Sequence, residues 1–152
     1  MQTLFALVGL SAFPSFGYYS ATKFALEGLS EVLAAEVAPH GIRTTIVEPG
    51  PFYTGFSARG MTFGENLLPE VYPSTAELEA AFPQFDGPTA GDPVKAVRII
   101  IEAVESDDPP FRLPLGLFAY EGIEAKLERV KEEISVWRAR AVKTNFDAAA
   151  TA

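Results

Sequence analysis

The sequence predicts an α/β fold built on a parallel sheet of about three strands. Short runs of apolar and β-branched residues alternate with longer segments of helical periodicity. One helix and short turns separate the first two runs, and strands joined in this way lie parallel because the crossover returns the chain to the same end of the sheet. With 152 residues, 48% of them hydrophobic and 21% charged, the chain has the composition of a globular domain.

The first third of the chain contains this strand–helix–strand unit. We expect a buried strand over residues 3–8, a loop over residues 9–17 and a helix over residues 18–38, in which small residues permit close packing. A Pro-His-Gly sequence stops the helix, with Gly41 able to adopt the left-handed cap conformation. Residues 42–48 are rich in β-branched side chains and predict the second strand.

Residues 51–92 form a contrasting segment with many glycines, prolines and aromatic residues and little regular structure. A segment of this length and composition is typical of a lid or binding loop. Its aromatic residues, Phe52, Tyr53 and Phe56 among them, favour a packed lid rather than a solvated linker. A Ser-Thr-Ala-Glu run at residues 74–77 predicts the cap of one short helix.

The last part of the chain predicts helix, strand and helix. Asp92 and Pro93 are a strong helix start, and the helix is expected to run to about Ser106. A short last strand over residues 111–115 and a long helix over residues 120–142 follow. The long helix carries one apolar stripe, which indicates packing rather than a cofactor site and is expected to be half-exposed unless the chain dimerises or repacks: Ile123, Leu127, Val130, Ile134 and Trp137. We expect one partial domain over residues 1–147 and a disordered tail over residues 148–152.

Composition excludes several classes of protein. A net charge of −8 and the lack of a basic face argue against nucleic-acid binding. The chain has no cysteine and one histidine, His40, so we expect no metal site, disulfide or thiolate nucleophile. The most apolar segment, residues 4–13, is about half the length of a membrane span, so we expect no membrane association and a cytoplasmic location.

Tyr19-Ser20-Ala21-Thr22-Lys23 contains the residues with the clearest chemistry. If the helix begins near Tyr19, then Tyr19 and Lys23 lie on one face, one turn apart. An ammonium beside a phenol favours the phenolate and lowers the phenol pKa, so that a proton can be exchanged with a substrate oxygen near neutral pH. A Tyr and a Lys at this spacing are common on helices, so the pair alone is a weak signal.

The surrounding sequence resembles the short-chain dehydrogenase/reductase family. The resemblance is carried by Tyr19 and Lys23, the His-Gly-Ile-Arg turn, Pro49-Gly50 with Thr54 beyond it, and the Phe-Arg-Leu-Pro-Leu-Gly run at residues 111–116. It covers nearly the whole chain. It implies the carboxyl-terminal part of a Rossmann-like doubly wound parallel sheet, and hydride transfer between NAD or NADP and a small-molecule carbonyl or alcohol.

The resemblance also implies roles for individual residues. Tyr19 would be the catalytic acid/base, and Lys23 would lower its pKa and hydrogen-bond the nicotinamide ribose. Pro49 and Gly50 would border the nicotinamide, and Thr54 would contact its carboxamide. Residues 51–92 would form the substrate lid.

The sequence departs from the family pattern in two places. The family's substrate-binding serine would fall at Ala6, which has no hydroxyl; Ser11 and Ser15 lie nearby but not at the matching position. No two glycines are two residues apart, so a glycine-rich dinucleotide turn cannot occur. We therefore expect a truncated oxidoreductase fragment lacking the amino-terminal half. The alternatives are an inactive fragment, an interaction module that pairs with related subunits or with its own copies, and one half of a split enzyme.

Overall fold

A three-stranded parallel sheet forms the centre of the molecule. A computed structural model describes residues 2–4, 7–60, 63–64, 68–87 and 90–144. The sheet contains β1 (Gln2–Leu4), β2 (Thr45–Pro49) and β3 (Arg112–Leu115), in the order β1-β2-β3. In the register, Thr3 faces Ile46 and Val47 faces Leu113. The predicted α/β fold with a parallel sheet of about three strands is confirmed.

The first strand is shorter than the sequence predicts. β1 stops at Leu4, and Leu7–Gly9 form a 3₁₀ helix, η1, so the assignment of residues 7 and 8 to a strand is wrong. Val8 is nevertheless buried, because η1 packs against the helix that follows it. A buried turn and a buried strand have the same apolar composition, which is why the two cannot be separated by hydrophobicity.

Helix α1 (Gly17–Val37) links β1 to β2, close to the predicted bounds. It continues into a short 3₁₀ helix, η2 (Ala38–His40), and Gly41 caps this end at φ 71° as expected. The second strand begins at Thr45 rather than at residue 42, and its centre is the most buried part of the chain, with Ile46 and Glu48 at 0% exposure. Ile42 stays outside the ladder and exposed.

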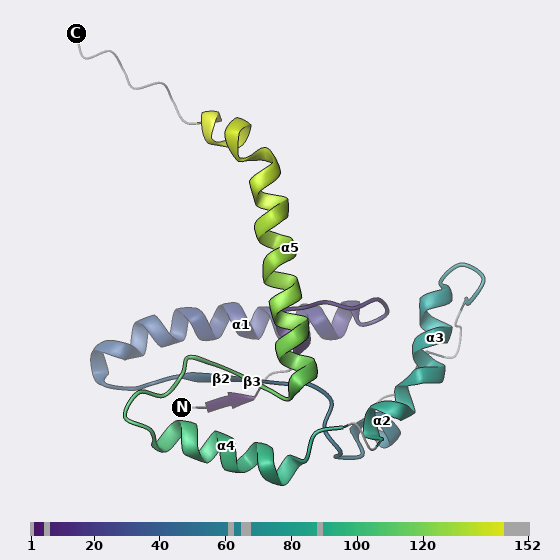
Figure 1. Cartoon of the computed structure of the whole chain (residues 1–152), viewed down its shortest axis with the longest axis horizontal. Helices are drawn as coiled ribbons and strands as arrows, with labels where there is room; N and C mark the ends of the chain where they lie inside the picture. The colour runs from purple at the N-terminus through teal and green to yellow at the C-terminus, as the bar shows by residue number, and fades with distance from the viewer. Residues whose placement is uncertain (1, 5–6, 61–62, 65–67, 88–89, 145–152) are drawn as a thin grey trace.

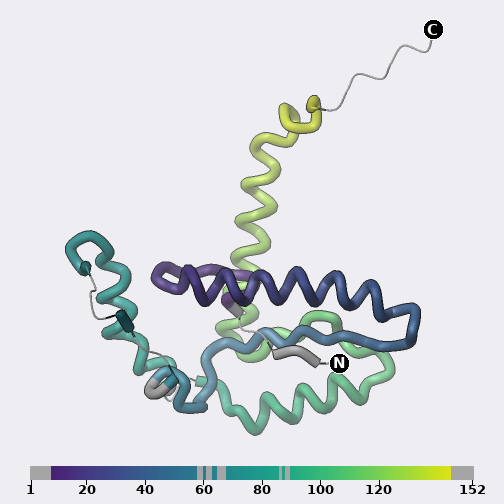
Figure 2. The backbone as a smooth tube through the Cα atoms, turned by 180° about the vertical axis from the view of Figure 1, so that it is seen from behind, coloured from purple at the N-terminus to yellow at the C-terminus, as the bar shows by residue number. Residues whose placement is uncertain are grey.

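Helices α1 and α4 (Pro93–Glu105) lie on opposite sides of the strands (Figures 1 and 2). Both observed ends of α4 agree with the prediction. No residue of α4 is buried, and all but Ile100 of its larger apolar side chains are exposed: Val94, Val97, Ile99, Ile101 and Val104. The apolar side chains of α4 are therefore largely uncovered.

The start of α4 allows a test of local stability. The Asp92 carboxylate accepts hydrogen bonds from the backbone N–H groups of Val94 (2.8 Å) and Lys95 (3.4 Å). Asp92→Ala is expected to lower the free energy of unfolding by about 1 kcal/mol, because these N–H groups lose their acceptor. Urea titration would measure the loss. Asp92→Asn retains a capping oxygen and serves as the control; an equal loss in both variants would contradict the capping explanation.

The segment between β2 and α4 has more regular structure than predicted. It contains α2 (Phe56–Arg59), α3 (Pro73–Ala81) and a 3₁₀ helix, η3 (Phe82–Asp86), and extends away from the sheet (Figures 1 and 2). The short helix expected near residues 74–77 is present, but Tyr72 is its N-cap and no side chain caps it, so the predicted capping run is wrong. Pro73 at the first position begins the helix instead.

Helix α5 (Leu117–Ala141) begins three residues before the predicted start and ends in a 3₁₀ turn, η4 (Val142–Thr144). Ala119 and Ile123 form a small core with Leu10 and Phe13. After Ile123, α5 stands away from the body of the molecule (Figure 1), and Trp137 is 59% exposed. The stripe packs on the domain at Ile123, and Leu127, Ile134 and Trp137 are exposed, in agreement with a stripe that is left half-exposed. The predicted tail, residues 148–152, lies outside the described residues.

Candidate active site

The predicted site residues come from one edge of the sheet. Because β1 and β2 are parallel, α1 must carry the chain from the carboxyl end of β1 back to the amino end of β2. The first turn of α1 therefore lies at the edge where β2 ends in Pro49, followed by Gly50. Ligands of open α/β sheets bind beyond this edge.

Tyr19 and Lys23 lie one turn apart near the start of α1, and both are half-buried. The Lys23 Nζ is 5.4 Å from the centroid of the Tyr19 ring, a cation–π contact. Tyr18, the preceding residue, is 95% exposed, so the helix turns the second of the two tyrosines toward the body. The structure brings the two predicted residues together, and their catalytic roles stay predictions.

The electrostatics of Tyr19 differ from the sequence-based expectation. Burial raises the pKa of the Tyr19 phenol above its ordinary value of 10.0. The expected lowering of this pKa by Lys23 is wrong for the structure described here. The Lys23 ammonium contacts the face of the ring, and the cost of removing a phenolate from water dominates.

Phe16 connects Tyr19 to the lid, a contact that the sequence analysis missed. The Phe16 ring centroid is 6.1 Å from that of Tyr19 and 5.9 Å from that of Phe82, which is buried in η3. Phe85 continues the cluster, with its ring 5.7 Å from Phe82 and 6.5 Å from Phe118 on α5. Phenylalanines in both segments were the available signal, but a pairing between residues so distant in sequence is decided by the fold.

The serines near the predicted substrate position have separate roles. Ser11 is buried, and the Ser15 hydroxyl lies 3.0 Å from the Thr75 hydroxyl on α3. Ser15 has φ 68°, the left-handed region, so this loop adopts a backbone conformation that is unusual for a residue with a side chain. Ala6, where the family's serine is absent, lies outside the described residues.

The residues expected to border a nicotinamide lie along the chain after β2. Pro49 and Gly50 are half-buried, and the Gly50 N–H donates to the Leu115 carbonyl at 3.0 Å. A Cβ at Gly50 would stand 3.3 Å from the Ala119 backbone nitrogen, so a glycine lets α5 begin close by. The Thr54 hydroxyl is exposed and lies 3.4 Å from the Phe52 carbonyl oxygen.

Of the three predicted lid residues, Phe52 packs against another segment of the chain. Phe52 pairs with Gly91 in an isolated bridge, and a Cβ on Gly91 would stand 2.5 Å from the Phe52 ring. Tyr53 and Phe56 are 67% and 47% exposed and remain accessible to a ligand.

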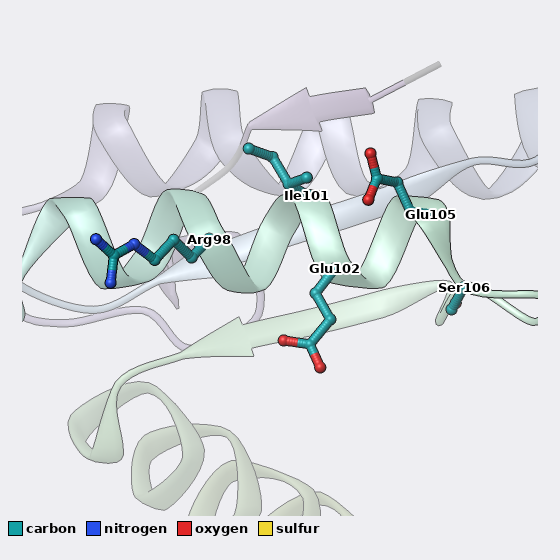
Figure 3. A pocket seen from close by; sticks show the side chains of 5 residues that line it. All are labelled: Arg98, Ile101, Glu102, Glu105 and Ser106. Atoms are coloured by element: carbon teal, nitrogen blue, oxygen red, sulfur yellow. The ribbon is translucent and has the colours of Figure 1, made fainter.

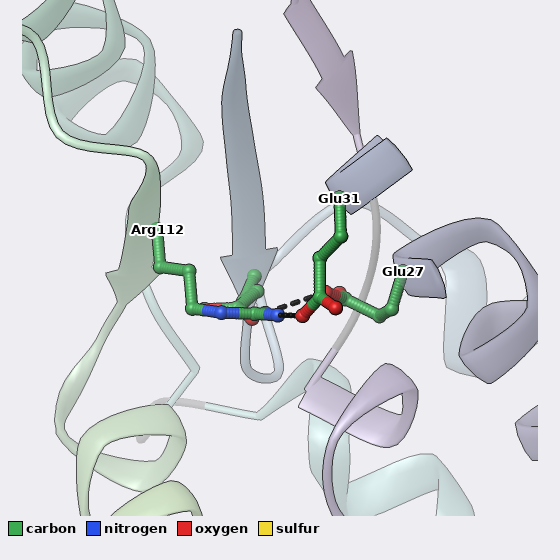
Figure 4. A network of polar contacts seen from close by, with 4 residues as sticks. Glu27, Glu31 and Arg112 are labelled. Atoms are coloured by element: carbon green, nitrogen blue, oxygen red, sulfur yellow. Dashed lines mark hydrogen bonds and ion pairs between the residues drawn. The ribbon is translucent and has the colours of Figure 1, made fainter. Parts of the chain in front are cut away.

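A partly buried ionic cluster joins α1, β2 and β3 (Figure 4). Arg112 on β3 donates through Nη1 to Glu27 of α1 at 2.5 Å and to Glu48 of β2 at 2.7 Å, and through Nη2 to Glu31 of α1 at 2.5 Å. The side chains of Glu27 and Glu48 are 5% and 1% exposed. Among the described residues, one oxygen of each of these two carboxylates is buried without a hydrogen-bond partner. A single guanidinium thus faces three carboxylates, two of them out of water.

Glu48 makes stability depend on pH. Burial, opposed by the hydrogen bond from Arg112 and assisted by the charge of Glu27, raises the Glu48 pKa above its ordinary value of 4.5. A carboxyl with a raised folded-state pKa stabilises fully below its unfolded-state pKa, and this contribution is lost as pH rises through the folded-state value.

We therefore expect Glu48→Gln, which imitates the neutral carboxyl, to match the parent below about pH 4.5 and to become the more stable protein as pH rises. Urea denaturation of both proteins from pH 4 to 8 would measure the difference in free energy of unfolding. Glu133→Gln, which changes an exposed carboxylate on α5, serves as the control. A difference that does not grow with pH would contradict the assignment.

A hollow lies along α4 (Figure 3). It has a volume of about 430 Å³ and is lined by Arg98, Ile101, Glu102, Glu105 and Ser106. Within the described ranges, no group of three or more His, Asp or Glu side chains could hold a metal ion. No helix of the described chain is long and apolar enough to cross a membrane.

Comparison with known proteins points to one family. Residues 4–61 match a family model described as short chain dehydrogenase. The chain is 35% identical over 111 residues to 3-ketodihydrosphingosine reductase of Bacteroides thetaiotaomicron, covering 71% of this chain and 40% of the relative. It is 29% identical over 112 residues to human 17-beta-hydroxysteroid dehydrogenase type 1, covering 68% of this chain and 33% of the relative.

A solved structure gives the same answer for the fold. The crystal structure of a short-chain dehydrogenase from Streptomyces avermitilis superimposes with a TM-score of 0.78 at 37% identity, covering 95% of this chain and 52% of that one. The chain therefore spans about half the length, or less, of the relatives it matches. With the match of its sequence and of nearly its whole fold, the chain belongs to the short-chain dehydrogenase/reductase family of oxidoreductases.

Proposed function

We propose that this chain supplies the acid/base and substrate-binding part of an NAD- or NADP-dependent reductase or dehydrogenase acting on a carbonyl or an alcohol. The observation that carries the proposal is the Tyr19–Lys23 contact at the start of α1, located at the edge of the sheet where ligands of this fold class bind. Family membership supports the reaction class.

In the proposed reduction, bound NADH or NADPH supplies the hydride that reaches the carbonyl carbon. The Tyr19 phenol donates its proton to the carbonyl oxygen, and in the reverse direction the phenolate accepts the proton of the alcohol. The Lys23 ammonium, which contacts the Tyr19 ring, would hold the nicotinamide ribose. Phe16 and the lid would keep water from the proton path, which strengthens these electrostatic interactions.

The residues present fit one end of a nicotinamide dinucleotide. Tyr19, Lys23, Pro49 and Gly50 are half-buried residues at one edge and would hold the nicotinamide and its ribose. The pyrophosphate end needs a glycine-rich turn at a helix start, and these 152 residues contain no two glycines spaced by two. We propose that this turn comes from outside the 152 residues.

An apolar body on the substrate is supported by two observations. The ring contacts that start at Tyr19 run through Phe16, Phe82 and Phe85 to Phe118. The names of two relatives specify a 3-ketodihydrosphingosine and a 17-beta-hydroxysteroid. We propose that the substrate carries its carbonyl or hydroxyl on a comparable apolar body.

The function is tested by joining the chain to the glycine-rich half of a relative, such as the Streptomyces avermitilis dehydrogenase. We expect the joined protein to bind NADH or NADPH by calorimetry and to oxidise it in the presence of a long-chain ketone. The 152-residue chain alone, checked for folding by circular dichroism, is the control and should bind either cofactor far more weakly. A joined protein that binds cofactor but turns over no carbonyl would contradict the proposal.

A second experiment tests whether the nucleotide-binding half binds this chain as a partner. We propose that the nucleotide-binding half packs along the free edge of β1 and over the exposed apolar side chains of α4, such as Val97 and Ile101. Co-expressed as a separate chain, the half should co-elute with this one, and Ile101→Glu should weaken the complex. Val136→Glu, on the far part of α5, is the control. Self-association of the chain with no affinity for the half would favour a homo-oligomer.

A further inference from the structure

Arg112 and its carboxylates have a geometric relation to Tyr19 and Lys23. Tyr19, Lys23, Glu27 and Glu31 follow one another at intervals of four residues, which places them along one ridge of α1. The proposed acid/base pair lies toward the amino-terminal end of this ridge. Two of the three carboxylates bound by Arg112 follow it toward the carboxyl-terminal end.

Arg112 and the three carboxylates that it binds form a clamp that connects α1 to the sheet. Arg112 belongs to β3, and its Nη1 also binds Glu48, the residue before Pro49 at the end of β2. Glu27 is further confined by the turn before α1, since a Cβ on Gly9 would stand 2.9 Å from Glu27 Oε1. The ridge of α1 and the end of β2 therefore meet at one guanidinium, and the turn at Gly9 lies against the Glu27 side chain.

The planar fork of an arginine explains why this contact can fix an orientation. Its nitrogen donors point in set directions, so binding Glu27 and Glu31 through different nitrogens restricts rotation of α1 about its own axis. A lysine in the same place would present one point charge and would restrain distance more than rotation.

We infer that Arg112 is a positioning residue, which holds the Tyr19–Lys23 ridge of α1 at one rotation and depth on the sheet through Glu27 and Glu31. The inference deepens the proposed function and rests on it for the role of the pair. The burial that raises the Tyr19 pKa is what a helix held against the body would produce. Loss of the clamp should let the helix turn and expose the phenol.

The test uses the 152-residue chain without cofactor or substrate. Its five tyrosines are replaced by 3-fluorotyrosine, whose phenol titrates at a lower pH, and are followed by ¹⁹F NMR. The Tyr19→Phe variant identifies the Tyr19 signal by its disappearance. We expect Arg112→Gln to move the Tyr19 titration midpoint downward, and Arg112→Lys to move it downward by a smaller amount.

Arg129→Gln is the matched control, because Arg129 is an exposed arginine with one carboxylate partner on its own helix. It should leave the Tyr19 midpoint unchanged. A purely stabilising role for Arg112 would leave the midpoint of the folded Arg112→Gln protein at the parent value, and that result would overturn the inference.

Glu31→Ala keeps the inference falsifiable if Arg112→Gln does not fold. It removes the acceptor on α1 that binds Nη2 and leaves the bonds of Arg112 to Glu27 and Glu48 in place. A smaller downward shift in this variant supports the inference, and an unchanged midpoint overturns it. The titration midpoint of Tyr19 does not depend on turnover. Failure of the positioning role therefore appears in this titration, whereas failure of the proposed reaction appears only in the turnover of the joined protein.

Discussion

Tyr19→Phe is expected to lower the turnover number of the joined, cofactor-binding protein by about 10²–10⁴-fold, the range that a general acid/base contributes. The substitution removes the hydroxyl that would give its proton to the carbonyl oxygen. It keeps the ring, and with it the contacts to Lys23 and Phe16. The affinity for the cofactor should therefore change much less than the turnover number.

The measurement is steady-state oxidation of NADH or NADPH with a saturating ketone, beside calorimetric binding of the cofactor. Tyr18→Phe is the matched control, since Tyr18 precedes Tyr19 on the same helix and is 95% exposed. Equal turnover by Tyr19→Phe and the parent would reject Tyr19 as the acid/base while leaving the family assignment intact.

Arg112→Met is expected to lower the free energy of unfolding by about 3–5 kcal/mol at neutral pH. The guanidinium is the partner of two buried carboxylates, Glu27 and Glu48. Removing it leaves negative charge in a region without water, and that desolvation is no longer offset by hydrogen bonds. Urea denaturation followed by circular dichroism would measure the loss.

Two comparisons make this prediction specific. Arg129→Met, which changes an exposed ion pair on α5, should alter stability by less than about 1 kcal/mol. The triple change Arg112→Met, Glu27→Leu and Glu48→Leu should recover most of the lost stability, because no buried charge remains. A triple variant as unstable as Arg112→Met would show that packing around the arginine, rather than its charge, causes the loss.

Local features were predictable where the deciding interactions lie within a few residues. The Asp92–Pro93 start of α4 needs only a side-chain acceptor and a fixed proline φ, and both ends of that helix agree with the prediction. The Tyr19–Lys23 contact follows from one turn of helix. The end of β1 was less predictable, because an apolar run does not distinguish a buried strand from a buried turn.

The ionic cluster shows what lay beyond the sequence. Arg112 is 85 residues from Glu27 and 64 residues from Glu48 in the sequence. The residues around each of them do not indicate that these three side chains meet. The exposure of the far part of α5 is a similar case, since its apolar stripe has the same spacing as one that packs.

The sequence by itself determined the order of the three strands and of the long helices α1, α4 and α5, the parallel connection through α1 and the spacing of Tyr19 and Lys23. These depend on local backbone preferences and helical periodicity, which act over a few residues. Only the tertiary structure decided which charges are buried together, that Phe16 joins Tyr19 to the lid, and that burial raises the Tyr19 pKa. Desolvation is set by every atom around a group, and those atoms come from segments that meet only when the chain has folded.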